Sequence, residues 1–332
     1  MSRVLVTGGA GFIGSHVAEA LVRRGHDVTV LDDLSGGSLD NVPAGVRFVR
    51  GSITDAALVD HIFLERRFEH VYHLAAYAAE GLSHFIKRFN YTNNLIGSVN
   101  LINASVNTGV QCFVFTSSIA VYGARAALPV TEDTQPQPED PYGIAKYAVE
   151  QELRTSRDMF GLRYVIFRPH NVFGPRQNIA DRYRNVVGIF MNQILLGKPM
   201  TIFGDGLQTR AFSYIDDVAP TIADAIDIAA AWDGVFNIGA DQTYTLNELA
   251  EHIAHAMGVE PAVVHLDRRH EASHARSDHR KVRSVFGERP ATALDVGLRR
   301  MAQWVNATGA RSSEAFGAIE ITKNLPPVWR VS

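Results

Sequence analysis

The sequence contains one cysteine, Cys112, among 332 residues, so no internal disulfide can form. Such scarcity is typical of proteins that work in a reducing compartment. No stretch approaches the roughly 18 consecutive uncharged apolar residues that a membrane-spanning helix needs. A strand-like run begins at residue 3 and leaves no room for a signal peptide. We therefore expect a cytoplasmic protein with no membrane partner.

The sequence also lacks a strong excess of positive or negative charge. Lys and Arg number 32 and Asp and Glu 35, and no long basic block occurs, so nothing indicates a nucleic-acid partner. Glycine and proline, at 27 and 13 residues, are ordinary in amount, which excludes collagen-like and low-complexity chains. The length suits one large domain or two modest ones.

A glycine-rich turn follows the first strand. Residues 4–6 form an apolar run, residues 7–14 read TGGAGFIG, and residues 15–25 have helical spacing. The next strand, residues 28–31, ends in Asp32 and Asp33. Strand, glycine turn, helix, strand and acid form the βαβ unit of a dinucleotide site. Glycines at such positions permit the tight turn, the approach of the backbone to a pyrophosphate and close helix–strand packing.

Asp32 indicates which dinucleotide binds. It lies at the strand end where a carboxylate accepts the ribose hydroxyls, and it would repel a 2′-phosphate. No arginine follows within the next ten residues to hold such a phosphate. The sequence therefore predicts NAD rather than NADP as the cofactor.

Strand-like runs continue at residues 46–49, 70–74, 112–116 and 164–167, with helical stretches between them. This alternation predicts an α/β fold, a doubly wound parallel Rossmann sheet with helices on both faces. The periodicity is lost after Pro169, where a different lobe is expected to begin. We expect an NAD-binding domain over residues 1–172, with returning segments at about 211–240. A smaller C-terminal substrate-binding lobe is expected over residues 173–332.

Three side chains suggest chemistry at the sheet's carboxyl edge. The strand at 112–116 leads into Ser117 and Ser118, and Tyr142 and Lys146 follow on one face of a predicted helix. A free tyrosine is a poor base at neutral pH, but a nearby ammonium and the positive nicotinamide ring favour the phenolate. Ser118 can donate a hydrogen bond to the same substrate oxygen. The three residues predict a tyrosine-based catalytic site.

These motifs resemble the extended short-chain dehydrogenase/reductase family, and within it the NAD-dependent nucleotide-sugar epimerases and dehydratases. The matching segments are TGGAGFIG (7–14), YHLAA (72–76), TSSIAVYG (116–123), PYGIAK (141–146), FRPHNVFGPRQ (167–177) and IFGDGLQTRAFSYIDDVA (202–219). They occur in the family's order over roughly residues 3 to 285.

The resemblance implies a role for each matching residue. Tyr142 would be the catalytic base, Lys146 would bind the nicotinamide ribose and tune the tyrosine, and Ser118 would bond the sugar's 4-oxygen. The implied cofactor-binding residues are Gly8, Gly11, Phe12, Ile13, Gly14, Asp32, Asp33, Ser52, Ile53, Leu74, Ala75, Ala76, Asn93, Tyr142 and Lys146. The implied substrate-binding residues are Ser118, Tyr142, Asn171, Arg210 and Arg268.

The residues after Ser118 narrow the choice within the family. Dehydratases need acids there, decarboxylating members a glutamate and 3,5-epimerases a cysteine, but this chain has Ile119 and Ala120. A 4-epimerase needs only one base and a tightly held NAD. The resemblance therefore implies a nucleotide-sugar 4-epimerase, with UDP-glucose and UDP-galactose as the default pair.

Several alternatives stay open. Lys87 and Arg88 would suit the carboxylate of a UDP-glucuronate, and a small residue near Ala275 would admit UDP-N-acetylhexosamines. The remaining alternatives are a dehydratase whose acids lie at other positions, a 4-keto reductase and a non-catalytic NAD-sensing protein.

The resemblance also implies a homodimer, built from the helices around residues 92–108 and 142–158. Four histidines invite a metal site, but their spacing is loose and the expected chemistry needs no metal, so none is expected. They are His265, His270, His274 and His279.

Overall fold

The computed structural model describes residues 1–269, 273–312, 316–317 and 319–329. Seven parallel strands form the central sheet in the order β11-β6-β5-β4-β1-β2-β3. The strands are β1 (Arg3–Thr7), β2 (Asp27–Asp32), β3 (Arg47–Arg50), β4 (His70–His73), β5 (Cys112–Thr116), β6 (Arg163–Pro169) and β11 (Gly234–Ile238). The doubly wound Rossmann sheet predicted from the sequence is confirmed.

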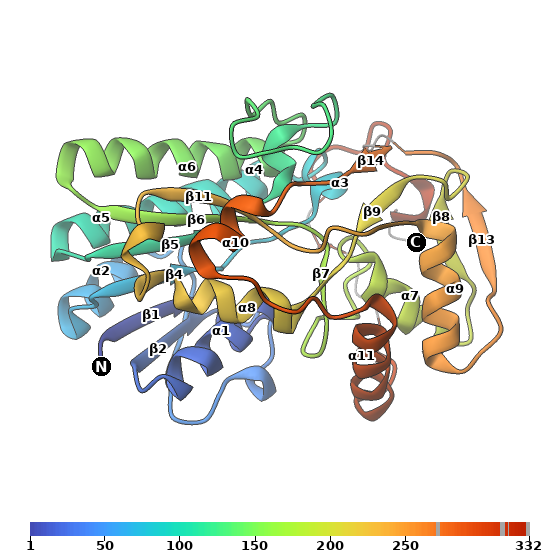
Figure 1. Cartoon of the computed structure of the whole chain (residues 1–332), viewed down its shortest axis with the longest axis horizontal. Coiled ribbons are helices and arrows are strands. Elements are labelled where there is room, and N and C mark those ends of the chain that lie inside the picture. Colours follow the sequence, from blue (N-terminus) through green and yellow to red (C-terminus); the bar gives the residue numbers. More distant parts are fainter. Residues whose placement is uncertain (270–272, 313–315, 318, 330–332) are drawn as a thin grey trace.

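Helices cover both faces of the sheet (Figure 1). Successive side chains of a strand point to opposite faces, so in β1 Val4 and Val6 enter one core and Leu5 enters the other. The helices packed against the Leu5 face are α2 (Ala56–Arg66), α5 (Gly97–Thr108) and α6 (Pro141–Phe160). Those on the opposite face are α1 (Phe12–Arg23), α8 (Ile215–Ala223) and α10 (Arg280–Phe286). Because both faces are buried, the strands read as continuous apolar runs.

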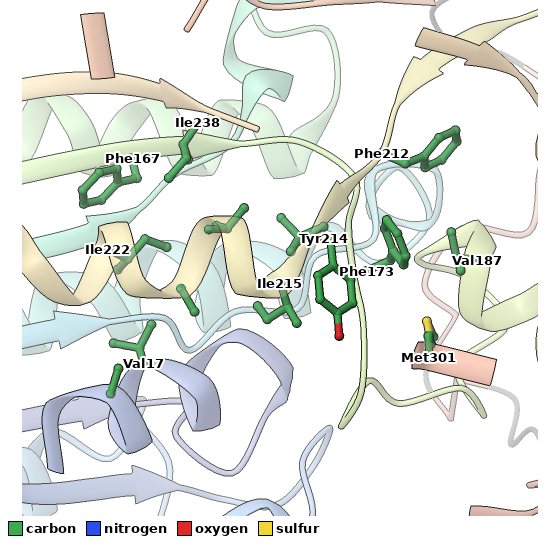
Figure 2. Packing of buried hydrophobic residues seen from close by; sticks show 14 of the residues in the cluster. Val17, Phe167, Phe173, Val187, Phe212, Tyr214, Ile215, Ile222, Ile238 and Met301 are labelled. Atoms are coloured by element: carbon green, nitrogen blue, oxygen red, sulfur yellow. The ribbon is translucent and has the colours of Figure 1, made fainter. Parts of the chain in front are cut away.

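Beyond the carboxyl ends of the strands lies a second group of elements, on the right of Figure 1. Its helices are α7 (Val186–Leu195), α9 (Leu246–Met257) and α11 (Leu294–Thr308). Its short strands are β7 (Val172–Phe173), β8 (Met200–Phe203), β9 (Thr209–Ala211), β10 (Ser213–Tyr214), β12 (Thr243–Thr245), β13 (Val263–Leu266) and β14 (His274–Ala275). One apolar cluster runs from Val17 and Ile222 beside the sheet to Val187 and Met301 in this second group (Figure 2). The two groups therefore share a core.

The predicted helix at residues 92–108 is one continuous helical path with an irregular start. It consists of α4 (Lys87–Tyr91), a π-helical turn (Thr92–Ile96) and α5, and it follows the short α3 (Glu80–Ser83). Gly109 ends it with φ +77°, as a left-handed glycine C-cap does. None of the described helices is both long and apolar enough to cross a membrane.

A buried ion pair fixes α6 against the sheet. Arg168 of β6 reaches both carboxylate oxygens of Glu150, with Nη2–Oε2 at 2.5 Å and Nε–Oε1 at 2.9 Å. Ser117, at the end of β5, donates to Glu150 Oε1 at 2.6 Å. Arg168 also donates to Tyr122 Oη at 2.7 Å, and Tyr122 donates to Asn237 of β11 at 2.8 Å. One carboxylate on α6 therefore connects the ends of three strands.

We expect Glu150→Gln to lower the free energy of unfolding by about 3 kcal/mol, because it leaves the buried guanidinium without a countercharge. Urea denaturation measures the change. Glu152→Gln, an exposed change on the same helix, is the matched control. Equal stabilities for the two variants would contradict the role given to the ion pair.

Candidate active site

A cavity of about 1040 Å³ opens along the carboxyl ends of the central strands. It is at the upper end of the range of small-molecule pockets, so a cofactor and a substrate can lie in it together. The predicted site residues that line it are Gly8, Gly11, Phe12, Ile13, Gly14, Asp32, Asp33, Ser52, Ile53, Leu74, Ala75, Ala76, Asn93, Ser118, Tyr142, Lys146, Asn171 and Arg210. Arg268 is the one predicted site residue that does not line it.

The glycine turn between β1 and α1 has the shape that a dinucleotide needs. A Cβ atom on Gly14 would lie 2.0 Å from the carbonyl oxygen of Gly8, so no larger residue fits there. Gly8 itself has φ +72°. Asp32, 7% exposed at the end of β2, accepts a hydrogen bond from Ala10 N at 3.0 Å, which orients its carboxylate. Turn and acid together fit NAD.

Tyr142, Lys146 and Ser118 come together at the inner end of the cavity. Asp140 caps α6 by accepting from Gly143 N at 2.9 Å, which begins the helix one residue before the tyrosine. Lys146 Nζ donates to the carbonyl oxygen of Thr116 at 2.8 Å and lies 5.7 Å from the centroid of the Tyr142 ring. Ser118 lines the same cavity, and its hydroxyl acts to lower the pKa of Tyr142. The spacing of four residues predicted on one helical face is the geometry observed.

Burial sets the proton affinities of this group. Burial raises the pKa of Tyr142, the negative charge of Glu80 raises it further, and the hydrogen bond with Ser118 acts in the opposite direction. Burial also lowers the pKa of Lys146 to about 7, and the Glu150 carboxylate acts in the opposite direction. The sequence predicted that the ammonium would lower the tyrosine's pKa. In the protein alone burial outweighs such effects, because the phenolate would lose nearly all contact with water.

Of the two arginines expected to hold a diphosphate, one lines the cavity. Arg210 of β9 lines the cavity, but the side chain of Arg268 packs near Gly204 instead. Arg269, the next residue, lines the cavity in its place. Neighbouring residues in an extended segment point to opposite sides, so a shift of one position exchanges a cavity residue for an outer one.

Asn171 is held in an unusual conformation. Its φ of +40° lies in the left-handed region, which asparagine tolerates better than most residues. Its Nδ2 donates to the carbonyl oxygen of Ala211 at 3.1 Å. This bond fixes the side chain at the cavity wall.

The sequence analysis did not identify three residues of the cavity wall, Tyr77, Asp181 and Arg184. Arg184 pairs with Asp181 at 2.7 Å and lies over the ring of Tyr77 at 4.7 Å. A Cβ on Gly36, in the loop after β2, would lie 2.8 Å from Arg184 Nη2. The segment around Arg184 has no periodicity, so no sequence signal pointed to it.

The basic pair considered as an alternative contact for a sugar carboxylate lies outside the cavity, at the exposed start of α4. Lys87 and Arg88 are exposed and do not line the cavity, and Arg88 pairs with Glu320 at 3.5 Å. The cavity near Tyr142 instead contains the carboxylate of Glu80.

Of the four histidines considered for a metal, the three that the structure describes each bond a different partner. His265 bonds Gly204 O, His274 bonds Thr209 and His279 bonds Asp241, at 2.8, 2.8 and 2.7 Å. His270 lies outside the described residues.

Comparison with known proteins agrees with this site. The model of the NAD dependent epimerase/dehydratase family matches residues 4–239. The chain belongs to this family. NAD is accordingly its cofactor, as the glycine turn and Asp32 indicate.

Individual relatives extend the similarity beyond the matched region. The chain is 36% identical to the UDP-glucose 4-epimerase of Mycolicibacterium smegmatis over 310 residues, which are 91% of this chain and 98% of the relative. The structure of the Thermotoga maritima UDP-glucose 4-epimerase with UDP-glucose has a TM-score of 0.88 at 35% identity, covering 92% of this chain and 99% of that one. The Thermus thermophilus UDP-glucose 4-epimerase in complex with NAD has a TM-score of 0.84 at 34% identity, covering 91% and 98%.

The lowered pKa of Lys146 predicts a pH-dependent stability in nucleotide-free protein. Between about pH 7 and its unfolded-state value near 10.4, the unfolded chain holds a proton that the folded chain has lost. Folding stability from this residue therefore rises with pH, by at most about 1.4 kcal/mol per pH unit. Lys146→Met removes the effect. In urea titrations from pH 7 to 9, the free energy of unfolding of the wild type should rise with pH relative to that of Lys146→Met. A difference that stays constant with pH would contradict the lowered pKa of Lys146.

Proposed function

We propose that this protein is a nucleotide-sugar 4-epimerase that interconverts UDP-glucose and UDP-galactose. The observation that carries the proposal is that Tyr142 and Ser118 line the same cavity as the glycine turn, together with Ile119 and Ala120, which follow Ser118 in the chain. The side chains of Ile119 and Ala120 line the cavity, and neither can act as an acid or a base. The site thus provides one base at the sheet edge.

Each side chain has a definite part in the reaction. Bound NAD supplies the acceptor, and then the donor, of the hydride at carbon 4. Tyr142 takes the proton of the 4-hydroxyl as the carbon is oxidised to a ketone, and it returns that proton after the sugar has turned. Ser118 donates a hydrogen bond to the same oxygen. Lys146 is expected to bond the nicotinamide ribose. Arg210, Arg269 and Asn171 hold the rest of the substrate while the sugar turns, since guanidinium groups bind diphosphates well.

The cavity favours neutral sugars over uronates. Glu80 acts electrostatically on Tyr142, and a sugar carboxylate placed at the same point would meet like charge. The cations that suggested a uronate, Lys87 and Arg88, lie outside the cavity. Ala275 lines the cavity with its small side chain, which leaves UDP-N-acetylglucosamine as the second candidate substrate.

Proton NMR in heavy water tests the function. The purified protein is incubated without added NAD and separately with UDP-glucose, UDP-N-acetylglucosamine and UDP-glucuronate. We expect the 4-epimer of UDP-glucose with no deuterium on the ring, because the hydride is returned within one active site. Glu80 and other acids line the cavity, so deuterium at carbon 5 or a 4-keto-6-deoxy product would instead identify a dehydratase. If no sugar nucleotide changes, the result would favour the alternative of a non-catalytic NAD-sensing protein.

Tyr142→Phe should lower kcat by about a thousandfold, which is the contribution of a well-placed acid–base group. Binding of UDP and the NAD content should stay normal, because the ring remains in place. Tyr147→Phe, at a half-buried position of the same helix that does not line the cavity, is the control. Wild-type turnover in Tyr142→Phe would exclude this residue as the base.

We also infer that two copies pair through the outer face of the helices beside Tyr142. The π-helical turn and α6 pack against each other, and each exposes an isoleucine, Ile96 at 51% and Ile144 at 42%. Ile144→Glu should reduce the mass in light scattering to the 36.5 kDa of one chain. Leu64→Glu, at a site on α2 that is 59% exposed, should leave it at twice that value. A wild type that is already monomeric would contradict this inference.

Two smaller inferences accompany the proposal. We take residues 1–172, with the returning segments 211–240, as the cofactor-binding domain, and the position of β11 at the sheet edge supports the return. A cytoplasmic location is supported by the fully buried, unpaired Cys112, and cell fractionation tests it.

A further inference from the structure

The chain after α11 returns to the active site as a strap, which we define as residues 319–329. The backbone N–H of Glu320 donates to Phe85 O at 2.8 Å. Its carboxylate accepts from the backbone N–H groups of Arg88 and Phe89, at 2.9 and 3.0 Å. Those two groups open α4, where a helix leaves its N–H groups without partners. Directional bonds therefore fix the strap to the segment that carries α3 and α4.

Apolar packing then holds the end of the strap. Trp329 and Leu325 are only 3% and 4% exposed. They belong to a small core, separate from those of the sheet, with Ala79, Leu82, Ile86 and Tyr183. Trp329 meets the rings of Tyr183 and Phe85 edge-on, with centroids 5.4 and 6.2 Å apart. The strap is thus an integral part of the packed molecule.

The segment beneath the strap belongs to the active site. Glu80, Gly81 and His84 line the cavity. Ser83 Oγ accepts from Tyr142 N at 3.3 Å, so the segment touches the start of the catalytic helix. At Gly81 an added Cβ would lie 3.1 Å from Trp329, which shows how closely the strap approaches.

Trp329 is itself a wall of the cavity. It lines the cavity together with Phe203 and Arg269. The Arg269 guanidinium lies over the Phe203 ring at 4.5 Å and over the Trp329 ring at 5.8 Å. Such cation–π contacts restrict a long, mobile side chain to one region. The tryptophan therefore shapes the cavity and helps to place the arginine.

We propose that Trp329, carried by the strap, is a positioning and specificity-determining residue of the nucleotide-sugar site. It closes the cavity wall beside Phe203 and holds Arg269 where a nucleoside diphosphate can meet it. This inference rests on the proposed function, in that the ligand is taken to be a UDP-sugar. Trp329 does not touch the reacting pair of Tyr142 and Ser118. It should therefore contribute equally to binding of the substrate and of the transition state.

Loss of such uniform binding raises KM and leaves kcat unchanged. For Trp329→Ala we expect the KM of UDP-glucose and the Kd of UDP each to rise about tenfold, with kcat changed less than about threefold. Trp329→Phe retains an aromatic face and should recover most of the affinity. Calorimetry with UDP gives Kd independently of turnover.

Trp304→Ala is the matched control, because this tryptophan is half-buried on α11 and does not line the cavity. It should lower the thermal midpoint without changing Kd. An unchanged Kd in Trp329→Ala, or an equal rise in Trp304→Ala, would overturn the proposal. Should Trp329→Ala not fold, Glu320→Ala tests the strap through its bonds to α4, and an unchanged Kd there has the same meaning.

The outcomes separate the two proposals. A wild type that binds UDP but epimerises no sugar would contradict the proposed function. The Kd of UDP for the Trp329 variants would then still test the role of Trp329. A wild type that epimerises UDP-glucose while all the strap variants match it would overturn this inference alone. A wild type that does not bind UDP would contradict both.

Discussion

The buried contact between Glu150 and Arg168 is the interaction on which the catalytic geometry depends. Glu150 lies one helical turn beyond Lys146 and two beyond Tyr142, so the position of its carboxylate sets the rotation and height of α6. Ser117, next to Ser118, bonds the same carboxylate. Tyr142 and Ser118 are therefore located by one acid, although they come from a helix and a strand end. A full charge can stay buried there because every oxygen of the acid has a partner.

Burial that makes this geometry precise also controls its chemistry. Tyr142 and Lys146 are 6% and 3% exposed, and in each case burial disfavours the charged form. A neutral tyrosine beside a lysine that loses its proton easily is a poor base by itself. Under the proposed function, bound NAD would add a positive ring to the site and so favour the phenolate of Tyr142.

The substrate side is built differently. One side of the cavity is the edge of the sheet, while the rest of its lining combines segments far apart in the chain, including Tyr77, Arg184, Phe203, Arg269 and Trp329. Aromatic rings and guanidinium groups dominate this wall, which suits a planar base and a diphosphate. A reaction that requires the sugar to turn needs its firm contacts away from the reacting ring.

Local patterns in the sequence were sufficient for much of the site. The glycine turn, Asp32 and the Tyr142–Lys146 spacing are each set within a few residues by turn sterics, strand alternation or helical period, and all line the cavity. The strand Cys112–Thr116 was predicted to the residue for the same reason. By contrast, the choice of Arg269 over Arg268, the outward position of Lys87 and Arg88, and the Glu150–Arg168 contact depend on segments far apart in the chain.

The strap shows this division most clearly, since its sequence has no period and gave no indication of function. The amino-acid sequence by itself determined the fold, the cofactor and the spacing of Tyr142 and Lys146 on one helical face, because short-range sterics and periodicity encode them. Only the tertiary structure decided which side chains complete the substrate wall. Those contacts form between residues as distant as Gly81 and Trp329, and no local property of either residue specifies the other.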